Sequence, residues 1–146
     1  MVNTTVIVNT GATVWLSGTV HLSALDIAAG GTVRVLEASN HVLVSNGLSI
    51  AGPDSNDNPG GLLDLGDNDL IVHGGSLGAI TQLLKVGYDG GLWDGPGVLA
   101  STIPSDAQAS IVSSVAEADP STLQALGVGE IGQPNAPVAG LFDGWG

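Results

Sequence analysis

The feature that most constrains the fold is a short block that recurs along the first half of the sequence. Residues 11–16 match residues 30–35 nineteen positions later, and residues 60–65 match that block again after thirty. Residues 25–28 likewise match residues 48–51 after twenty-three. A repeat of about 20 residues built from short strands is typical of a β-solenoid, in which each coil stacks on the next.

The longest of these spacings contains one insertion, residues 53–59, which is rich in Asp, Asn and Pro. Without its seven residues the spacing of thirty becomes twenty-three. Insertions in repeat proteins map to loops, so we expect this segment to project from one corner of the coils.

Alternation of apolar and polar residues predicts strands throughout the first half, each bounded by Gly, Asn or Ser. The segments with this pattern are residues 4–8, 13–16, 19–22, 32–35, 41–44 and 69–72. Strands at such intervals also fit a β-sandwich, which is the alternative fold. The repeat near one coil length favours a mainly β protein containing a short β-solenoid.

The second half of the chain has more Ala, Ser, Gln and Pro and reads as helices and loops. A first helix is expected after Ser76 as N-cap, with Gly87 as its stop. Its apolar positions are Leu77, Ile80, Leu83 and Leu84. A second helix is expected from about residue 104, and a third over residues 120–126. The apolar stripe of the second would be Ala107, Ile111, Val112 and Val115.

The expected organisation is therefore two regions packed as one domain. Residues 1–75 form the solenoid coils, and residues 76–146 form a helical and loop region that caps them.

Composition excludes several functions. The chain has 14 acidic residues against two basic ones, a formal net charge of −12, which excludes a basic surface for nucleic acid. Polybasic docking on an anionic membrane is excluded for the same reason. No apolar run approaches 18 residues, so no membrane insertion is expected. The absence of Cys excludes disulfides, zinc–thiolate sites and Cys nucleophiles.

Catalytic motifs are also missing from the sequence. There is no G-x-S-x-G elbow, no phosphate-binding glycine motif and no HExxH pair. Nothing in the sequence brings two carboxylates together for glycoside hydrolysis. We therefore expect no enzyme activity.

Acidic and amide side chains gather in turns, which makes these turns candidate calcium sites, because calcium prefers carboxylate and carbonyl oxygens. The candidate ligands are Asp54, Asn56, Asp57, Asn58, Asp67 and Asp69. The first loop is not an EF-hand, since Leu65 stands where the bidentate Glu belongs. Asp and Asn also suit tight turns without any metal, and both interpretations remain open.

Histidine and aromatic residues give two further candidates. His21 and His41 are one predicted coil apart and would bind a transition metal if they stacked; exposed strand positions are the simpler interpretation. Tyr88 and Trp93 lie in a Gly-rich loop and are expected to cap the open end of the solenoid. A sugar-stacking surface is the alternative role for these two rings.

One segment carries a family resemblance. Residues 63–72 read LDLGDNDLIV, residues 83–98 read LLKVGYDGGLWDGPGV, and Ser101 follows. This pattern resembles a module of large secreted or surface proteins of planctomycete-like bacteria. In that family a β-solenoid runs into such a strand, then a short helix and a Gly/Trp loop, usually upstream of a calcium-binding dockerin-like repeat.

The resemblance covers residues 62–102 and implies an extracellular or cell-surface location, a structural or interaction role, and no enzyme activity. The sequence departs from the pattern at its end, where the family has a further strand and the dockerin-like repeat. No calcium site can be transferred from that segment.

Together these patterns predict a structural module: a stalk, surface-layer or fibre subunit. Open solenoid ends would let copies associate end to end, as homo-oligomers or filaments or with other surface proteins, with calcium assisting. A polysaccharide-binding module is the alternative, and a fragment of a solenoid carbohydrate-active enzyme is the third. For the alternative, the expected polar ladder on the strand faces is Thr4, Thr13, Thr19 and Thr32.

Overall fold

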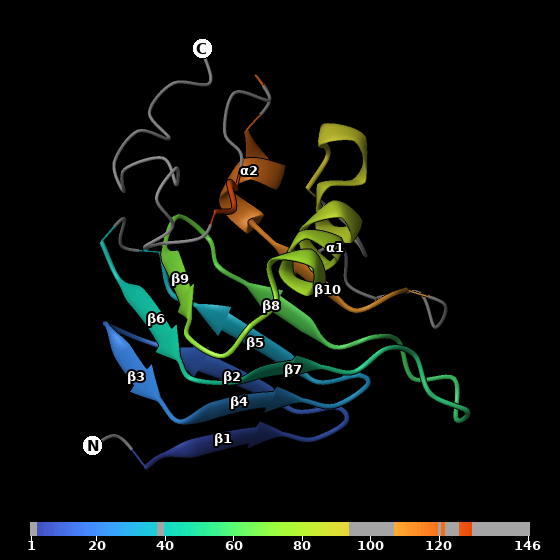
Figure 1. Cartoon of the computed structure of the whole chain (residues 1–146). Helices are drawn as coiled ribbons and strands as arrows, with labels where there is room; N and C mark the ends of the chain where they lie inside the picture. The colour runs from blue at the N-terminus through green and yellow to red at the C-terminus, as the bar shows by residue number, and fades with distance from the viewer. Residues whose placement is uncertain (1–2, 38–39, 94–106, 120, 122–125, 130–146) are drawn as a thin grey trace.

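A computed structural model describes residues 3–37, 40–93, 107–119, 121 and 126–129. Across these residues the chain is mainly β, with three parallel sheets and few helices (Figure 1). Sheet A contains β1 (Thr5–Val8), β4 (Ala24–Ile27) and β7 (Leu48–Ile50). Sheet B contains β2 (Thr13–Leu16), β5 (Thr32–Val35), β8 (Leu62–Asp64) and β10 (Ser110–Val112). Sheet C contains β3 (Val20–Leu22), β6 (Val42–Ser45) and β9 (Asp69–Val72).

Strand register confirms the repeats seen in the sequence. Thr13 lies beside Thr32, and Thr32 lies beside Leu62, so spacings of nineteen and thirty residues separate neighbours in sheet B. Leu25 lies beside Leu48 in sheet A, at the spacing of twenty-three. Every pair among the described strands is parallel, which differs from the antiparallel sheets of a β-sandwich.

Alternation within the strands builds one hydrophobic core shared by the three sheets. In β5, Val33 and Val35 are buried, whereas Thr32 and Arg34 are only partly covered. Sheets A and C add side chains from β4 and β6, namely Leu25, Ile27 and Leu43. Full burial of one such side chain contributes about 1.5–3 kcal/mol, so this core supplies most of the driving force for folding.

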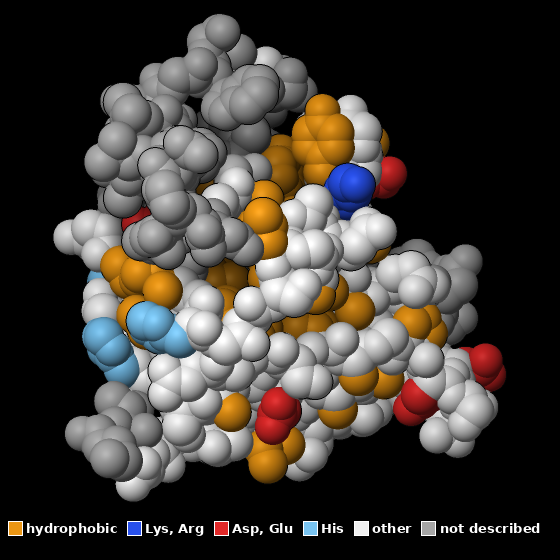
Figure 2. Space-filling view, in the orientation of Figure 1, with side chains coloured by type: hydrophobic (Ala, Val, Ile, Leu, Met, Phe, Trp, Pro, Cys, Tyr) orange, Lys and Arg blue, Asp and Glu red, His pale blue; other side chains and the backbone are white. Residues whose placement is uncertain are grey.

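The insertion at residues 53–59 is a loop, as predicted. It projects between β7 and β8 at the right of Figure 1, and most of its residues are exposed. Acidic side chains are visible on it in the space-filling view (Figure 2). It lengthens one connection without disturbing the register of β8 on β5.

Helix α1 (Leu77–Tyr88) begins where the sequence predicts. Ser76 is its N-cap, and the Ser76 hydroxyl accepts a hydrogen bond from the Ala79 amide at 3.3 Å. The predicted stop at Gly87 is wrong, because the helix continues to Tyr88 and ends at Asp89 in the left-handed conformation. A short 3-10 turn (Asp89–Gly91) follows.

The predicted second helix is wrong where it covers Ile111 and Val112. These residues form β10, which pairs in parallel with β8, and helix α2 (Ser114–Ala118) starts only afterwards. Two adjacent apolar residues fit a buried strand as well as a helix, and the free side of β8 decides between them. The third predicted helix, over residues 120–126, falls mostly outside the described residues.

Candidate functional site: the two ends of the sheets

The strands β1, β2 and β3 form one end of the three sheets, called here the N-terminal edge. Within the described parts of the chain, no strand pairs with the outer side of any of the three. In β2, the carbonyls of Ala12 and Leu16 accept bonds from the β5 side, from Thr32 and Leu36. Backbone groups alternate along a strand, so the amide and carbonyl of Thr13 turn toward the open side.

Strand β1 repeats this arrangement. The carbonyls of Thr4 and Val8 accept bonds from Ser23 and Ala28, on the side of β4. The backbone groups of Ile7 therefore turn toward the open side. With respect to the described residues, the N-terminal edge thus offers free backbone donors and acceptors that another strand can pair with.

Apolar surface is also left uncovered at the N-terminal edge. Four of its inward side chains are only partly buried, although they pack on the core: Val6, Val14, Leu16 and Val20. Val8 and Leu22, at the ends of β1 and β3, are buried. On the outer faces, Ile7 is 65% exposed and Trp15 is 59% exposed. Hydrophobic side chains are visible at the lower margin of Figure 2, where Figure 1 places β1.

Charge is missing from this edge. All 14 acidic residues and both basic ones lie at or after Asp26, so residues 1–25 contain no Asp, Glu, Lys or Arg. Edge strands are normally protected from pairing by charged side chains or Pro. The N-terminal edge has neither within its strands.

The opposite end of sheet B is covered. The bonds of β10 to β8 use Ser110 and Val112, so the carbonyl of Ile111 faces outward. Gly87 of α1 packs against that carbonyl so closely that a Cβ on Gly87 would overlap the Ile111 oxygen. Helix α1 therefore covers the last edge of sheet B.

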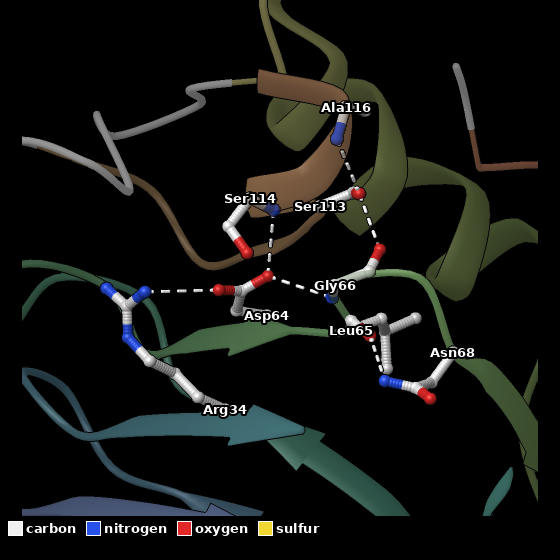
Figure 3. Close-up of polar contacts among 8 residues, drawn as sticks. All are labelled: Arg34, Asp64, Leu65, Gly66, Asn68, Ser113, Ser114 and Ala116. Atoms are coloured by element: carbon white, nitrogen blue, oxygen red, sulfur yellow. Dashed lines mark hydrogen bonds and ion pairs between the residues drawn. The ribbon is translucent and has the colours of Figure 1, made fainter. Parts of the chain in front are cut away.

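A buried carboxylate fixes the chain around this covered end (Figure 3). Asp64, 2% exposed, pairs with Arg34 at 3.1 Å, between Oδ2 and Nη1. Its other oxygen, Oδ1, accepts hydrogen bonds from the amides of Gly66 at 3.0 Å and Ser114 at 2.9 Å. Ser113 Oγ donates to the Gly66 carbonyl at 2.6 Å and accepts from the Ala116 amide at 3.0 Å, so α2 is capped and held against β8.

Arg34 connects this buried carboxylate to the surface. Its guanidinium carbon lies 5.7 Å from the centre of the Trp15 ring, within the range of a cation–π contact. Trp15, Arg34 and Asp64 are register neighbours on β2, β5 and β8. The sequence interpretation missed Trp15; the signal was available, because Val14 and Leu16 point inward and place Trp15 outward.

The candidate calcium ligands of the insertion bind one another. Asp54 Oδ1 accepts from the amides of Asn56 at 2.8 Å and Asn58 at 3.2 Å, and the Asn58 side-chain amide donates to both carboxylate oxygens. These bonds, led by the Asn58 side chain, hold the pKa of Asp54 below its usual value of 3.8. Asp57 adopts a left-handed conformation in the same loop. This geometry is that of a tight turn.

The second candidate group lies at the start of β9. Asp67 and Asp69 are exposed, and Asn68 between them is buried. The Asn68 side chain donates to the carbonyls of Leu36 and Leu65 and accepts from the His41 amide. In the described part of the chain no three His, Asp or Glu side chains gather as a metal site. Calcium binding stays a prediction.

Stacking of His21 on His41 does not occur. The register advances by twenty-three residues between β3 and β6, not by twenty, so His21 lies beside Val44. His41 instead accepts a hydrogen bond from the Gly18 amide through Nδ1 at 3.2 Å. The spacing of the two histidines therefore does not match the spacing of neighbouring strands.

Tyr88 and Trp93 contact each other at the covered end. Their ring centroids are 5.4 Å apart in an edge-to-face arrangement. Trp93 is 4% exposed and belongs to the core, whereas Tyr88 is about half exposed. The buried Trp93 ring presents no open face to a sugar. The capping role of the two rings stays a prediction.

Comparison with known proteins found no matching family model, no matching curated protein and no matching solved structure. Among the described helices, none has the length and hydrophobicity needed to cross a membrane.

Proposed function

We propose that the chain is a non-catalytic structural module of the cell exterior, built as a short β-solenoid, that associates with itself through its N-terminal edge. The order of strands supports the solenoid. The chain visits sheets A, B and C in turn, first with β1, β2 and β3, then twice more through β9. The resemblance over residues 62–102 supports the external location.

The observation that carries self-association is the combination of open backbone and absent charge at the N-terminal edge. Strand addition to an exposed edge gives affinity through main-chain hydrogen bonds. Copies of a chain with net charge −12 repel one another, whereas residues 1–25 carry none of the 14 acids. A second copy therefore approaches this edge at low electrostatic cost.

We expect the purified protein to have a mass above that of one chain when light scattering follows gel filtration over a range of concentrations. The Thr13→Asp variant, with a charge on the outer face of the edge strand β2, should associate at least about tenfold more weakly, ~1.4 kcal/mol. Leu92→Asp, which adds the same charge at an exposed position of the covered end, should associate like the parent.

The same measurement is repeated in calcium and in chelator. Association that persists in chelator supports edge pairing, and association lost there supports bridging by the Asp-rich turns instead. A single chain at every concentration contradicts the proposed function.

A polysaccharide-binding surface is the second candidate, favoured by the exposed Trp15. Its ring lies on the same face of sheet B as the neighbouring Thr13 and Thr32. An aromatic ring beside a row of hydroxyls suits a sugar chain. We expect retardation in affinity gels containing polysaccharide to be lost in Trp15→Ala and kept in Leu36→Ala. Equal mobility of the parent protein with and without polysaccharide would contradict this candidate.

A further inference from the structure

We infer that the partner at the N-terminal edge is the same edge of a second copy, related by a two-fold axis, so that association stops at a dimer. The inference rests on the proposed self-association and adds its geometry.

The partner has to match three open edges at once. Strands β1, β2 and β3 begin three different sheets and present their outer sides together. A single added strand would pair with only one of them. The same edge of a second copy presents three strands in the same arrangement, so it can pair with all three.

The far end of the molecule does not offer this match. Sheet B continues there one strand further than sheets A and C, because β10 follows β8. The outer side of β10 is then covered by α1, where Gly87 meets the Ile111 carbonyl. A head-to-tail contact would bring the three open edges of one copy against an end at which sheet B is one strand longer and is covered by α1.

The relative direction of the edge strands in the two copies follows from the parallel sheets. When two copies face each other through the same edge, a two-fold axis reverses the strands of one relative to the other. The strands therefore meet antiparallel, a pairing slightly more stable per residue than the parallel one. One edge strand pairs with the same strand of the second copy. Each of the other two pairs with the other one's counterpart in the second copy. Such an isologous contact uses the N-terminal edges of both copies and leaves neither of them free.

Electrostatics favours this contact over others. The nearest acid on sheet A is Asp26, beside Ile7 and one strand in from the edge. If β1 meets β1, three strand spacings separate the two Asp26 positions, about 14 Å. That separation exceeds the Debye length of about 8 Å at physiological salt, so the repulsion is largely screened.

The absence of Cys allows the interface to be mapped with single cysteines. Ile7→Cys, Trp15→Cys and His21→Cys each place one thiol at an interior position of an edge strand, and Leu92→Cys is the control at the covered end. A short bis-maleimide should link two chains in at least one edge variant, or in a mixture of two of them. It should not link the control.

Thr13→Pro tests the backbone. Proline removes an amide that faces the open side, so the chain keeps its own bonds to β5 while β2 loses a donor for the partner. We expect Thr13→Pro to be a folded single chain, with unchanged circular dichroism.

In the parent protein, the mass in solution should level off at twice that of one chain as concentration rises.

The outcomes separate the two proposals. A mass that keeps rising beyond two chains, or cross-linking of the Leu92→Cys control, overturns the two-fold dimer while self-association stands. An undiminished dimer in a folded Thr13→Pro variant also overturns the edge contact. A single chain throughout overturns the proposed function itself.

Discussion

Replacing Gly87 by alanine should destabilise the protein by about 2–3 kcal/mol, although alanine is the better helix former. A Cβ at this position would overlap the carbonyl oxygen of Ile111, which belongs to the backbone of β10 and cannot rotate away. Helix α1 would have to move off the edge of sheet B. The cost of that movement outweighs the gain in helix propensity, which is at most ~1 kcal/mol.

The same helix contains its own control. At Gly78 an added Cβ would meet only the Ser76 hydroxyl, at an ordinary 3.7 Å. Gly78→Ala should therefore raise the free energy of unfolding, by up to about 1 kcal/mol. Urea denaturation of the two variants measures both changes. Similar stability for the two would show that α1 is not pressed against β10.

The repeats made most of the sheet register predictable. Residues 11–16, 30–35 and 60–65 carry Gly-containing turns followed by the same alternation, and their alignment gives the pairing of β2, β5 and β8. It also aligns Trp15, Arg34 and Asp64. The ion pair could have been read from that alignment, since opposite charges fell on neighbouring strands.

Strand β10 and the packing of α1 on sheet B could not be predicted from the local sequence pattern. Strand β10 contains only three residues, too few for a period of two to be distinguished from a helical one. Its conformation depends on the free side of β8, whose paired residues lie forty-eight positions earlier in the chain. The cover over sheet B depends equally on Gly87, whose lack of a side chain suggested a helix stop but instead permits close packing.

The candidate site was predictable only in part. The net charge of the whole chain excluded nucleic acid and anionic membranes as partners. A whole-chain value does not show that the residues before Asp26 are uncharged. The Asp-rich turns drew attention because their residues suit calcium, yet Asp54 and Asn58 bind each other. A carboxylate in a turn can satisfy neighbouring amides as readily as a metal, and sequence alone does not distinguish the two.

Removal of the Asp64 carboxylate should be the most costly polar change in the described part of the chain. In Asp64→Ala, the amides of Gly66 and Ser114 lose their acceptor, and Arg34 loses its ion-pair partner. Breaking a buried ion pair from one side costs about 3–5 kcal/mol. The Arg34 side chain is 23% exposed and can recover some hydration, so we expect the lower end, about 3 kcal/mol.

Replacing Arg34 tests whether the amide hydrogen bonds of the Asp64 carboxylate or its ion pair with Arg34 provides most of the stabilisation. Arg34→Met leaves Asp64 as a buried charge that keeps its two amide donors, so it should cost less than Asp64→Ala in urea denaturation. Hydrogen exchange at Ser114 should accelerate in Asp64→Ala and change little in Arg34→Met, because α2 is tied to the carboxylate rather than to the guanidinium. Equal costs for both variants would instead assign the stabilisation to the ion pair alone. The coupling between the two sites, measured with the double variant, then gives the share that the pair contributes.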